Sequence, residues 1–220
     1  MTKAFIFDMD GVIIDDESNW TKREKSLFKT IFGKDIASQI GNTVGVSSRL
    51  IFEKAKSLGF EGSKEATLRK WDEVAFEVYA QSAITPNVDL LVEYLLKNNL
   101  KIAIVSSSRM SWINKVLPRL SFKGSVEAII SLAEREDIEP KPSPEGYNEM
   151  IKTLGAVPDS TIILEDSNSG LKAARASGAY VISLSENLIP GYKQLDIADA
   201  KAKNMLEVIK ETEKWLQDER

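Results

Sequence analysis

The stretch Phe5-Ile-Phe-Asp-Met-Asp-Gly-Val-Ile-Ile14 decides both the fold and the site that we expect this chain to form. Its first three residues are typical of a buried β-strand, and the apolar run stops abruptly at Asp8. Asp8 and Asp10 are close enough to share a cation, and Gly11 allows the backbone to turn and to approach a ligand. A buried strand that ends in two carboxylates and a glycine predicts a site at its carboxyl end.

The overall charge and hydropathy exclude several classes of partner. The chain has 220 residues and a net charge of −4, so there is no electrostatic reason to expect a nucleic acid or an anionic membrane as partner. No apolar run approaches the roughly 18 residues that span a bilayer, and the first residues lack a signal-peptide pattern. We therefore expect a cytoplasmic protein.

Two residue types are absent from the sequence, and their absence limits the chemistry. Without cysteine there is no disulfide, thiolate nucleophile or Cys-bound zinc. Without histidine there is no Ser-His-Asp triad, His-ligated metal or imidazole acid–base catalysis. An enzyme of this composition would use carboxylates, Lys, Arg, hydroxyls or an oxygen-bound metal, for which Mg²⁺ is the leading candidate.

Hydrophobic periodicity divides the chain into a core and one insert. Residues 15–84 show helical spacing without a strand pattern, and Ser63 is placed to cap one of these helices. Residues 1–14 and 85–220 are expected to form a Rossmann-like, three-layer α/β core with a parallel sheet. Residues 15–84 would then form a small α-helical cap of three helices whose two connections act as hinges.

After Pro86, helix and strand patterns alternate, which predicts a parallel sheet covered on both faces. The expected strands are 3–7, 101–105, 128–131, 161–164 and 180–184, with a last short segment around 196–198. The expected helices are 88–97, 112–120, 144–154, 171–177 and 202–216.

Polar side chains follow three of these strands directly. Asp8 and Asp10, then Ser106, then Glu165 and Asp166 each come after a buried apolar run. A single Asp or Ser in such a place is more often a turn or capping residue. Because ligands bind at the carboxyl ends of open parallel sheets, the repetition at three strand ends favours a site.

Lys141 is the fourth candidate, in the stretch 139–144, which reads Glu-Pro-Lys-Pro-Ser-Pro. A lysine is usually a solvated surface residue. Here the flanking prolines restrict the backbone and disfavour a helix. A cation at this position could offset the carboxylates and hold phosphate oxygens as a point charge.

These elements resemble the four motifs of the haloacid-dehalogenase-like hydrolase superfamily. The matching segments are Phe7-Asp-Met-Asp-Gly-Val12, the strand ending in Ser106, Lys141 before Pro142, and Glu165-Asp-Ser-Asn-Ser-Gly170. Their order and spacing match over nearly the whole chain. Residues 164–178 look like the branch that contains beta-phosphoglucomutase and many sugar-phosphate phosphatases, which carry a helical cap between the first two motifs.

The resemblance implies a catalytic role for each motif. Asp8 would be the nucleophile that forms an aspartyl-phosphate, and Asp10 the general acid for the leaving oxygen and then the base for water. Lys141 and backbone N–H groups near Gly11 would reduce the repulsion between Asp8 and the phosphate.

The resemblance also implies Mg²⁺ as cofactor. The ion would be bound by Asp8, by the backbone carbonyl of Asp10 and by Asp166, with Glu165 nearby or bound through water. An acid at Asp10 favours phosphate-ester chemistry over dehalogenation, because dehalogenases and phosphonate-cleaving relatives generally lack it.

Substrate contacts are expected from two further places. The Ser106 hydroxyl would donate to the transferring phosphoryl group, aided by the Ser107 amide. The segment Gly45-Val-Ser-Ser-Arg49 resembles the mutase loop in which an arginine grips the non-reacting phosphate, although Arg49 could equally be a solvated residue at a helix start. Trp20, Trp71 and Phe76 are interpreted as core.

The expected function is a Mg²⁺-dependent phosphatase that acts on a small phosphorylated metabolite, a sugar phosphate, with the protein as a monomer. The main alternative is a phosphomutase. Mutases of this kind carry a histidine early in the cap, whereas the matching region here reads Asp16-Glu-Ser-Asn-Trp20. A second alternative is a non-catalytic phosphometabolite-binding protein, which is disfavoured because every chemically necessary position is filled.

Overall fold

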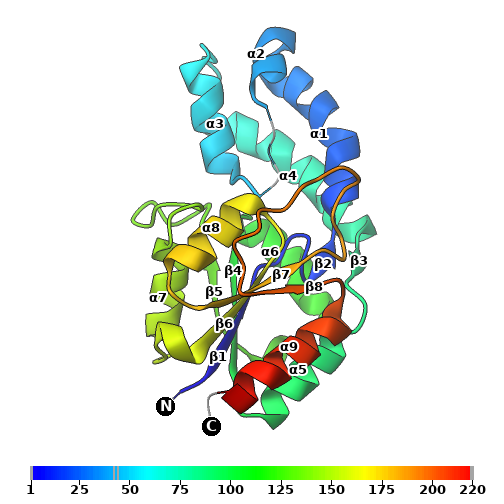
Figure 1. Cartoon of the computed structure of the whole chain (residues 1–220). Coiled ribbons are helices and arrows are strands. Elements are labelled where there is room, and N and C mark those ends of the chain that lie inside the picture. Colours follow the sequence, from blue (N-terminus) through cyan, green and yellow to red (C-terminus); the bar gives the residue numbers. More distant parts are fainter. Residues whose placement is uncertain (1, 42, 44, 219–220) are drawn as a thin grey trace.

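A six-stranded parallel sheet forms the centre of the computed structural model, which describes residues 2–41, 43 and 45–218 (Figure 1). The strand order is β5-β4-β1-β6-β7-β8, so β1 lies between β4 and β6. The strands are β1 (Ala4–Phe7), β4 (Lys101–Ser106), β5 (Val126–Ser131), β6 (Thr161–Glu165), β7 (Tyr180–Leu184) and β8 (Ala200–Ala202). The predicted first strand is therefore the middle of the sheet.

Helices cover both faces of the sheet, because successive side chains of a strand point to opposite faces. Phe5 and Phe7 of β1 belong to one apolar cluster, with residues of α5 (Val88–Lys97), α6 (Met110–Val116) and α9 (Met205–Asp218). Ala4 and Ile6 belong to the other, with residues of α7 (Glu145–Thr153) and α8 (Asn168–Ala176). Figure 1 shows α5 and α9 on one side of the sheet and α7 and α8 on the other. The predicted three-layer, Rossmann-like α/β fold is confirmed.

A helical segment lies over the carboxyl ends of the strands (Figure 1). It consists of α1 (Glu17–Phe32), α2 (Lys34–Gln39), α3 (Ser48–Ser57) and α4 (Lys64–Gln81). The Ser63 Oγ accepts a hydrogen bond from Ala66 N, so this serine caps α4 as predicted. The short α2 was not expected, because it contributes no fully buried residue and so has no marked apolar stripe.

The prediction that residues 15–84 contain no strand is wrong at both ends. Two-residue strands β2 (Ile14–Asp15) and β3 (Ala83–Ile84) pair antiparallel where the chain enters and leaves the helical segment. Arg119 donates to the carbonyls of Tyr79 and Ser82, the latter at 2.6 Å, which ties the end of α4 to the α/β part. The pairing of β2 with β3 places the two connections side by side. The domain limits and the hinge role of these connections stay predictions.

Several other boundaries also differ from the sequence prediction. The helix expected over 112–120 ends at Val116 and continues as a 3₁₀ turn, Leu117–Arg119, with Pro118 inside it. The last strand forms at Ala200–Ala202 instead of 196–198, because these residues pair with β7 while Ile197 and Ala198 pack on the α7–α8 side. Consequently α9 begins at Met205. Two more 3₁₀ turns, Lys123–Ser125 and Pro158–Ser160, precede β5 and β6.

None of the helices in the described ranges has the length and apolar character needed to cross a membrane.

Candidate active site

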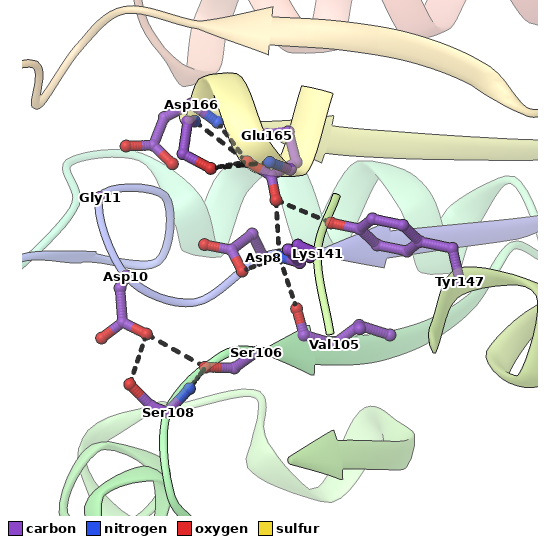
Figure 2. A network of polar contacts seen from close by, with 12 residues as sticks. Asp8, Asp10, Gly11, Val105, Ser106, Ser108, Lys141, Tyr147, Glu165 and Asp166 are labelled. Carbon is purple, nitrogen blue, oxygen red and sulfur yellow. Dashed lines mark hydrogen bonds and ion pairs between the residues drawn. The ribbon is translucent and has the colours of Figure 1, made fainter. Parts of the chain in front are cut away.

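Three neighbouring strands carry their terminal polar residues to one edge of the sheet. Asp8 follows β1, Ser106 ends β4 and Glu165 ends β6, and the Asp8 N–H donates to the Leu164 carbonyl at 3.0 Å. Figure 2 shows these residues around the loop that contains Gly11. The structure thus brings together the side chains that the sequence placed at the strand ends.

Lys141 is the centre of the polar network (Figure 2). Its Nζ lies 2.6 Å from Asp8 Oδ1 and 2.6 Å from Glu165 Oε1, and it donates to the Val105 carbonyl at 3.3 Å. The side chain is buried, which by itself would lower its pKa, but attraction to Asp8 and Glu165 outweighs burial and raises the pKa of Lys141. Lys141 therefore remains a full positive charge beside the expected nucleophile.

Glu165 has every carboxylate oxygen engaged by protein donors. Oε1 accepts from Lys141 and from the Tyr147 hydroxyl at 2.8 Å, and Oε2 accepts from the backbone N–H groups of Asp166 and Ser167, both at 3.0 Å. A Cβ at Gly170 would lie 1.7 Å from Glu165 Oε1, so a glycine is needed there. These contacts suit a residue that orients Lys141 better than a direct metal ligand.

Asp166 contrasts with Glu165, since both of its side-chain oxygens are buried and lack a hydrogen-bond partner among the described residues. Carboxylate oxygens of Asp8, Glu165 and Asp166 all lie within 4.8 Å of one another. Burial is the main cause that raises the pKa of Asp8 and of Asp166, and repulsion between the carboxylates adds to it. Three carboxylates thus face one ammonium, and unpartnered oxygens of this kind fit a hard divalent cation such as Mg²⁺.

Gly11 allows the loop to pass close to Asp166. Its φ is +73°, and a Cβ at this position would lie 2.1 Å from Asp166 Oδ2. The Gly11 N–H is not free, because it donates to Asp16 Oδ1 at 3.0 Å. The prediction that Gly11 lets the backbone approach closely is consistent with this geometry. Its N–H group, however, already donates to a protein acceptor.

The Asp10 side chain lies outside the carboxylate cluster, on the side of Ser106 and Ser108 (Figure 2). Its Oδ2 accepts from Ser106 Oγ at 3.0 Å and from Ser108 Oγ at 2.8 Å, and its Oδ1 accepts from the Tyr79 hydroxyl at 2.5 Å. Ser106 therefore contacts Asp10 directly. Sequence reasoning missed Tyr79 and Ser108.

A cavity of about 90 Å³ opens beside Asp10, between the helical segment and the α/β part. Trp20, Trp71 and Trp112 line it, so treating Trp20 and Trp71 only as core was incomplete, although Trp71 is also buried. Phe76, in contrast, is 37% exposed and does not line the cavity. Four acidic side chains also contribute to the walls, namely Asp10, Asp16, Glu17 and Glu24.

Ser107 and Arg49 differ in their relation to this cavity. Ser107 lines it, and its buried Oγ has no hydrogen-bond partner within residues 2–41, 43 and 45–218. Arg49 does not line it; its Nη1 donates to the Arg135 carbonyl at 3.2 Å and its Nη2 lies 3.8 Å from Glu139. The structure therefore does not bring Arg49 together with the other predicted site residues.

The family model for haloacid dehalogenase-like hydrolases matches residues 5–184, from β1 to the end of β7. The chain belongs to this family. The resemblance inferred from the four motifs is confirmed, and the matched range contains Asp8, Ser106, Lys141, Glu165 and Asp166.

Two curated relatives of this haloacid dehalogenase-like hydrolase match over almost their full length. Hexitol phosphatase B of Escherichia coli (strain K12) is 25% identical over 210 residues, which covers 93% of each chain. The phosphorylated carbohydrates phosphatase of Thermotoga maritima is 25% identical over 219 residues and covers 95% of this chain and 99% of its own.

A solved structure shows the same fold. It is beta-phosphoglucomutase from Clostridium difficile, which superposes with a TM-score of 0.78 at 24% identity and covers 99% of this haloacid dehalogenase-like hydrolase and 98% of its own chain.

Proposed function

We propose that this protein is a Mg²⁺-dependent phosphatase that hydrolyses a small phosphorylated metabolite, a sugar phosphate, through an aspartyl-phosphate. The observation that carries the proposal is Asp8, which lies 2.6 Å from Lys141 and within the same carboxylate cluster as the unpartnered oxygens of Asp166. Full-length relatives named as hexitol and carbohydrate phosphatases support the substrate class.

In the first half-reaction a carboxylate oxygen of Asp8 attacks phosphorus and the ester P–O bond breaks. The leaving oxygen keeps the bonding electron pair and takes a proton from Asp10. The adjacent Lys141 ammonium reduces the repulsion between the Asp8 carboxylate and the anionic phosphate.

In the second half-reaction Asp10 takes a proton from water, and the water oxygen attacks the phosphorus of the aspartyl-phosphate. The bond between phosphorus and Asp8 then breaks, which releases inorganic phosphate and regenerates the carboxylate. Ser106, Ser108 and Tyr79 surround Asp10 with hydroxyls. Because a hydroxyl both donates and accepts, these groups can stay in contact with Asp10 whether or not it carries the proton.

Mg²⁺ would be held by Asp8, Asp166 and the backbone carbonyl of Asp10, and it would supply positive charge that neutralises the phosphoryl oxygens. Glu165 would not bind the ion directly, because its oxygens already accept from Lys141, from Tyr147 and from the backbone at the start of α8. It would instead orient the neighbouring groups.

Two observations favour hydrolysis over the phosphomutase alternative. A mutase must hold a second phosphate, yet the residues that line the cavity in the described part of the chain include no Lys or Arg. Arg49 is instead engaged by Arg135 and Glu139. Residues 15–84 would act as the cap that shields this reaction from solvent; the cytoplasmic location and the monomeric state stay predictions.

The test is release of inorganic phosphate from a set of phosphomonoesters with and without Mg²⁺. We expect Mg²⁺-dependent release that is lost in Asp8→Asn and in Asp10→Asn, and retained in Asp159→Asn, an exposed acid at the amino end of β6, opposite to the edge where Asp8 lies. Interconversion of sugar phosphates without release would favour the mutase, and ligand-induced stabilisation without turnover would favour a binding protein. Release undiminished in Asp8→Asn would overturn the mechanism.

A further inference from the structure

The residues that line the cavity indicate the chemical class of the alcohol part of the substrate. We propose that the preferred substrate is a phosphomonoester whose alcohol part, an amino sugar or amino alcohol, carries a protonated amino group and no second phosphate. This inference rests on the proposed phosphatase function. The ammonium group would lie in the cavity beside Asp10, between the carboxylates of α1 and the aromatic rings.

The cavity is connected to the reacting groups through shared residues. Asp10 and Ser107 line the cavity and also follow β1 and β4 at the edge where Asp8 lies. An ester whose phosphorus is in contact with Asp8 and whose leaving oxygen is near Asp10 would therefore extend its alcohol part toward α1. The volume of about 90 Å³ is room for several water molecules, and hence for a small polar organic group.

The charged side chains that line the cavity in the described part of the chain are all acidic. Asp16, Glu17 and Glu24 line the cavity, and no Lys or Arg does so among the described residues. Asp16 is fully buried, and its Oδ2 has no hydrogen-bond partner in the part of the chain that the structure describes. Glu17 is 9% exposed. Buried carboxylates without a cationic partner are costly, so a ligand that brings a positive charge is favoured over one that brings a second negative charge.

The unpartnered oxygen of Asp16 is independent evidence that this cavity binds a hydrogen-bond donor. Its other oxygen accepts from Gly11 N at 3.0 Å, whereas no donor of the described chain reaches Oδ2. An ammonium group has three donors and no acceptor, so it can satisfy Asp16 and a neighbouring carboxylate at the same time.

Aromatic rings form the rest of the wall. Trp20, Tyr79 and Trp112 pack against one another, with ring centroids 6.1 Å (Trp20–Tyr79), 5.5 Å (Trp20–Trp112) and 6.2 Å (Tyr79–Trp112) apart. The Trp112 ring is held in place, because its Nε1 donates to Asp72 at 2.6 Å. Aromatic rings beside carboxylates can bind organic ammonium groups through cation–π contacts.

Other ligand classes fit these walls less well. A second phosphate would add negative charge to a lining that has no cationic side chain among its described residues. A neutral polyol could donate to Asp16, but it would bring no positive charge to Glu17 and Glu24 and would not use the aromatic rings as a cation does. The combination of acids and indoles therefore singles out the amine.

The experiment compares matched esters that differ only in the amino group, at pH 7 with saturating Mg²⁺. The pairs are 2-aminoethyl phosphate with 2-hydroxyethyl phosphate, and glucosamine 6-phosphate with glucose 6-phosphate; glucose 1,6-bisphosphate is the anionic comparison. We expect kcat/KM for the amine to exceed that of its hydroxyl partner by roughly tenfold, as a charge-assisted contact provides. Glu24→Gln should lower this ratio several-fold, while Glu73→Gln, an exposed acid of α4 outside the cavity, should leave it unchanged.

The wild-type pairs decide the inference without any variant. Equal kcat/KM within both pairs, or preference for the bisphosphate, would overturn it while leaving the phosphatase proposal intact. Release from none of these esters and none from p-nitrophenyl phosphate would overturn the proposed function and, with it, this inference. A second measurement, quenching of tryptophan fluorescence in Asp8→Asn, should show binding of 2-aminoethyl phosphate at lower concentration than of 2-hydroxyethyl phosphate.

Discussion

The hydroxyl of Tyr79 lies 2.5 Å from Oδ1 of Asp10, across 69 positions of sequence. Tyr79 belongs to the last turns of α4, whereas Asp10 follows the central strand of the sheet. The same hydroxyl lies 2.9 Å from Ser108 Oγ. The helical segment thus contributes a hydrogen bond to the residue proposed as the general acid and base.

This contact predicts a loss of activity in Tyr79→Phe. The substitution keeps the ring that lines the cavity and removes only the hydroxyl, so Asp10 loses one of the groups that orient it. A hydrogen bond to a charged group contributes roughly 1.5–3 kcal/mol, so we expect kcat to fall about tenfold to hundredfold. KM should change much less, because the hydroxyl acts on Asp10 in the turnover steps.

Steady-state kinetics on one phosphomonoester measures this effect. The matched control is Tyr180→Phe at the amino end of β7, where the ring packs on Trp215 away from the carboxyl ends of the strands. An unchanged kcat in Tyr79→Phe, or an equal loss in both variants, would contradict the orienting role.

The second prediction concerns the unpartnered carboxylate of Asp166. Because burial and neighbouring carboxylates raise its pKa, the charged form is destabilising without a cation. In Asp166→Asn we therefore expect a higher Tm than wild type in EDTA at pH 8, and a greatly reduced rise of Tm on adding Mg²⁺. Thermal unfolding with and without Mg²⁺ tests both effects, with Asp159→Asn as the control. A full Mg²⁺-induced rise in Asp166→Asn would exclude it as a ligand.

The third prediction separates backbone strain from steric contact at Gly11. Its φ is +73° and an added Cβ would lie 2.1 Å from Asp166 Oδ2, whereas Gly59 has a φ of +95° and no described residue within 4 Å of its added Cβ. Both alanine variants should lose about 1–2 kcal/mol from the left-handed backbone. Only Gly11→Ala should also lose the Mg²⁺-induced rise of Tm and phosphate release, because Asp166 must move.

Chemical denaturation and phosphate release measure the two effects separately. If Gly11→Ala and Gly59→Ala behave alike in both measurements, the close approach of the loop to Asp166 has no functional consequence.

The fourth prediction is a pH dependence of stability that arises from Glu17. Burial, and then repulsion by Asp10 and other acids, raises the pKa of Glu17 from 4.5 to about 7 in the folded protein. A group with a raised pKa stabilises the fold fully below its unfolded pKa, and this contribution is lost as the pH rises through the folded pKa. Between pH 5 and pH 8 the folded protein should therefore lose about 2–3 kcal/mol through this residue.

Glu17→Gln removes the titration. Its free energy of unfolding should exceed that of wild type at pH 8 and approach it near pH 4.5, with Glu61→Gln, an exposed acid, as the control. Urea denaturation at both pH values measures the difference. An equal effect at pH 8 and pH 4.5 would show that the titration of Glu17 is not coupled to folding.

Much of the α/β part could be predicted from the sequence because its elements are defined by local apolar patterns. The helix Val88–Lys97 and the strand Tyr180–Leu184 have the predicted limits. Asp8, Ser106 and Asp166 could be placed at one edge for a simple reason: parallel strands present their carboxyl ends together. The final strand was misplaced because its position depends on pairing with β7, which the local pattern around Ile197 does not reveal.

The sequence by itself determined the parallel sheet, the edge at which the acids and Lys141 meet, and the exclusion of histidine and cysteine chemistry. Only the tertiary structure decided which oxygens are free: Glu165 is fully engaged, whereas Asp166 is not. It also decided that Tyr79 reaches Asp10 and that acids and indoles share one cavity. The physical reason is that these contacts depend on how α1 and α4 pack over the strand ends, and residue spacing along the chain carries no information about that packing.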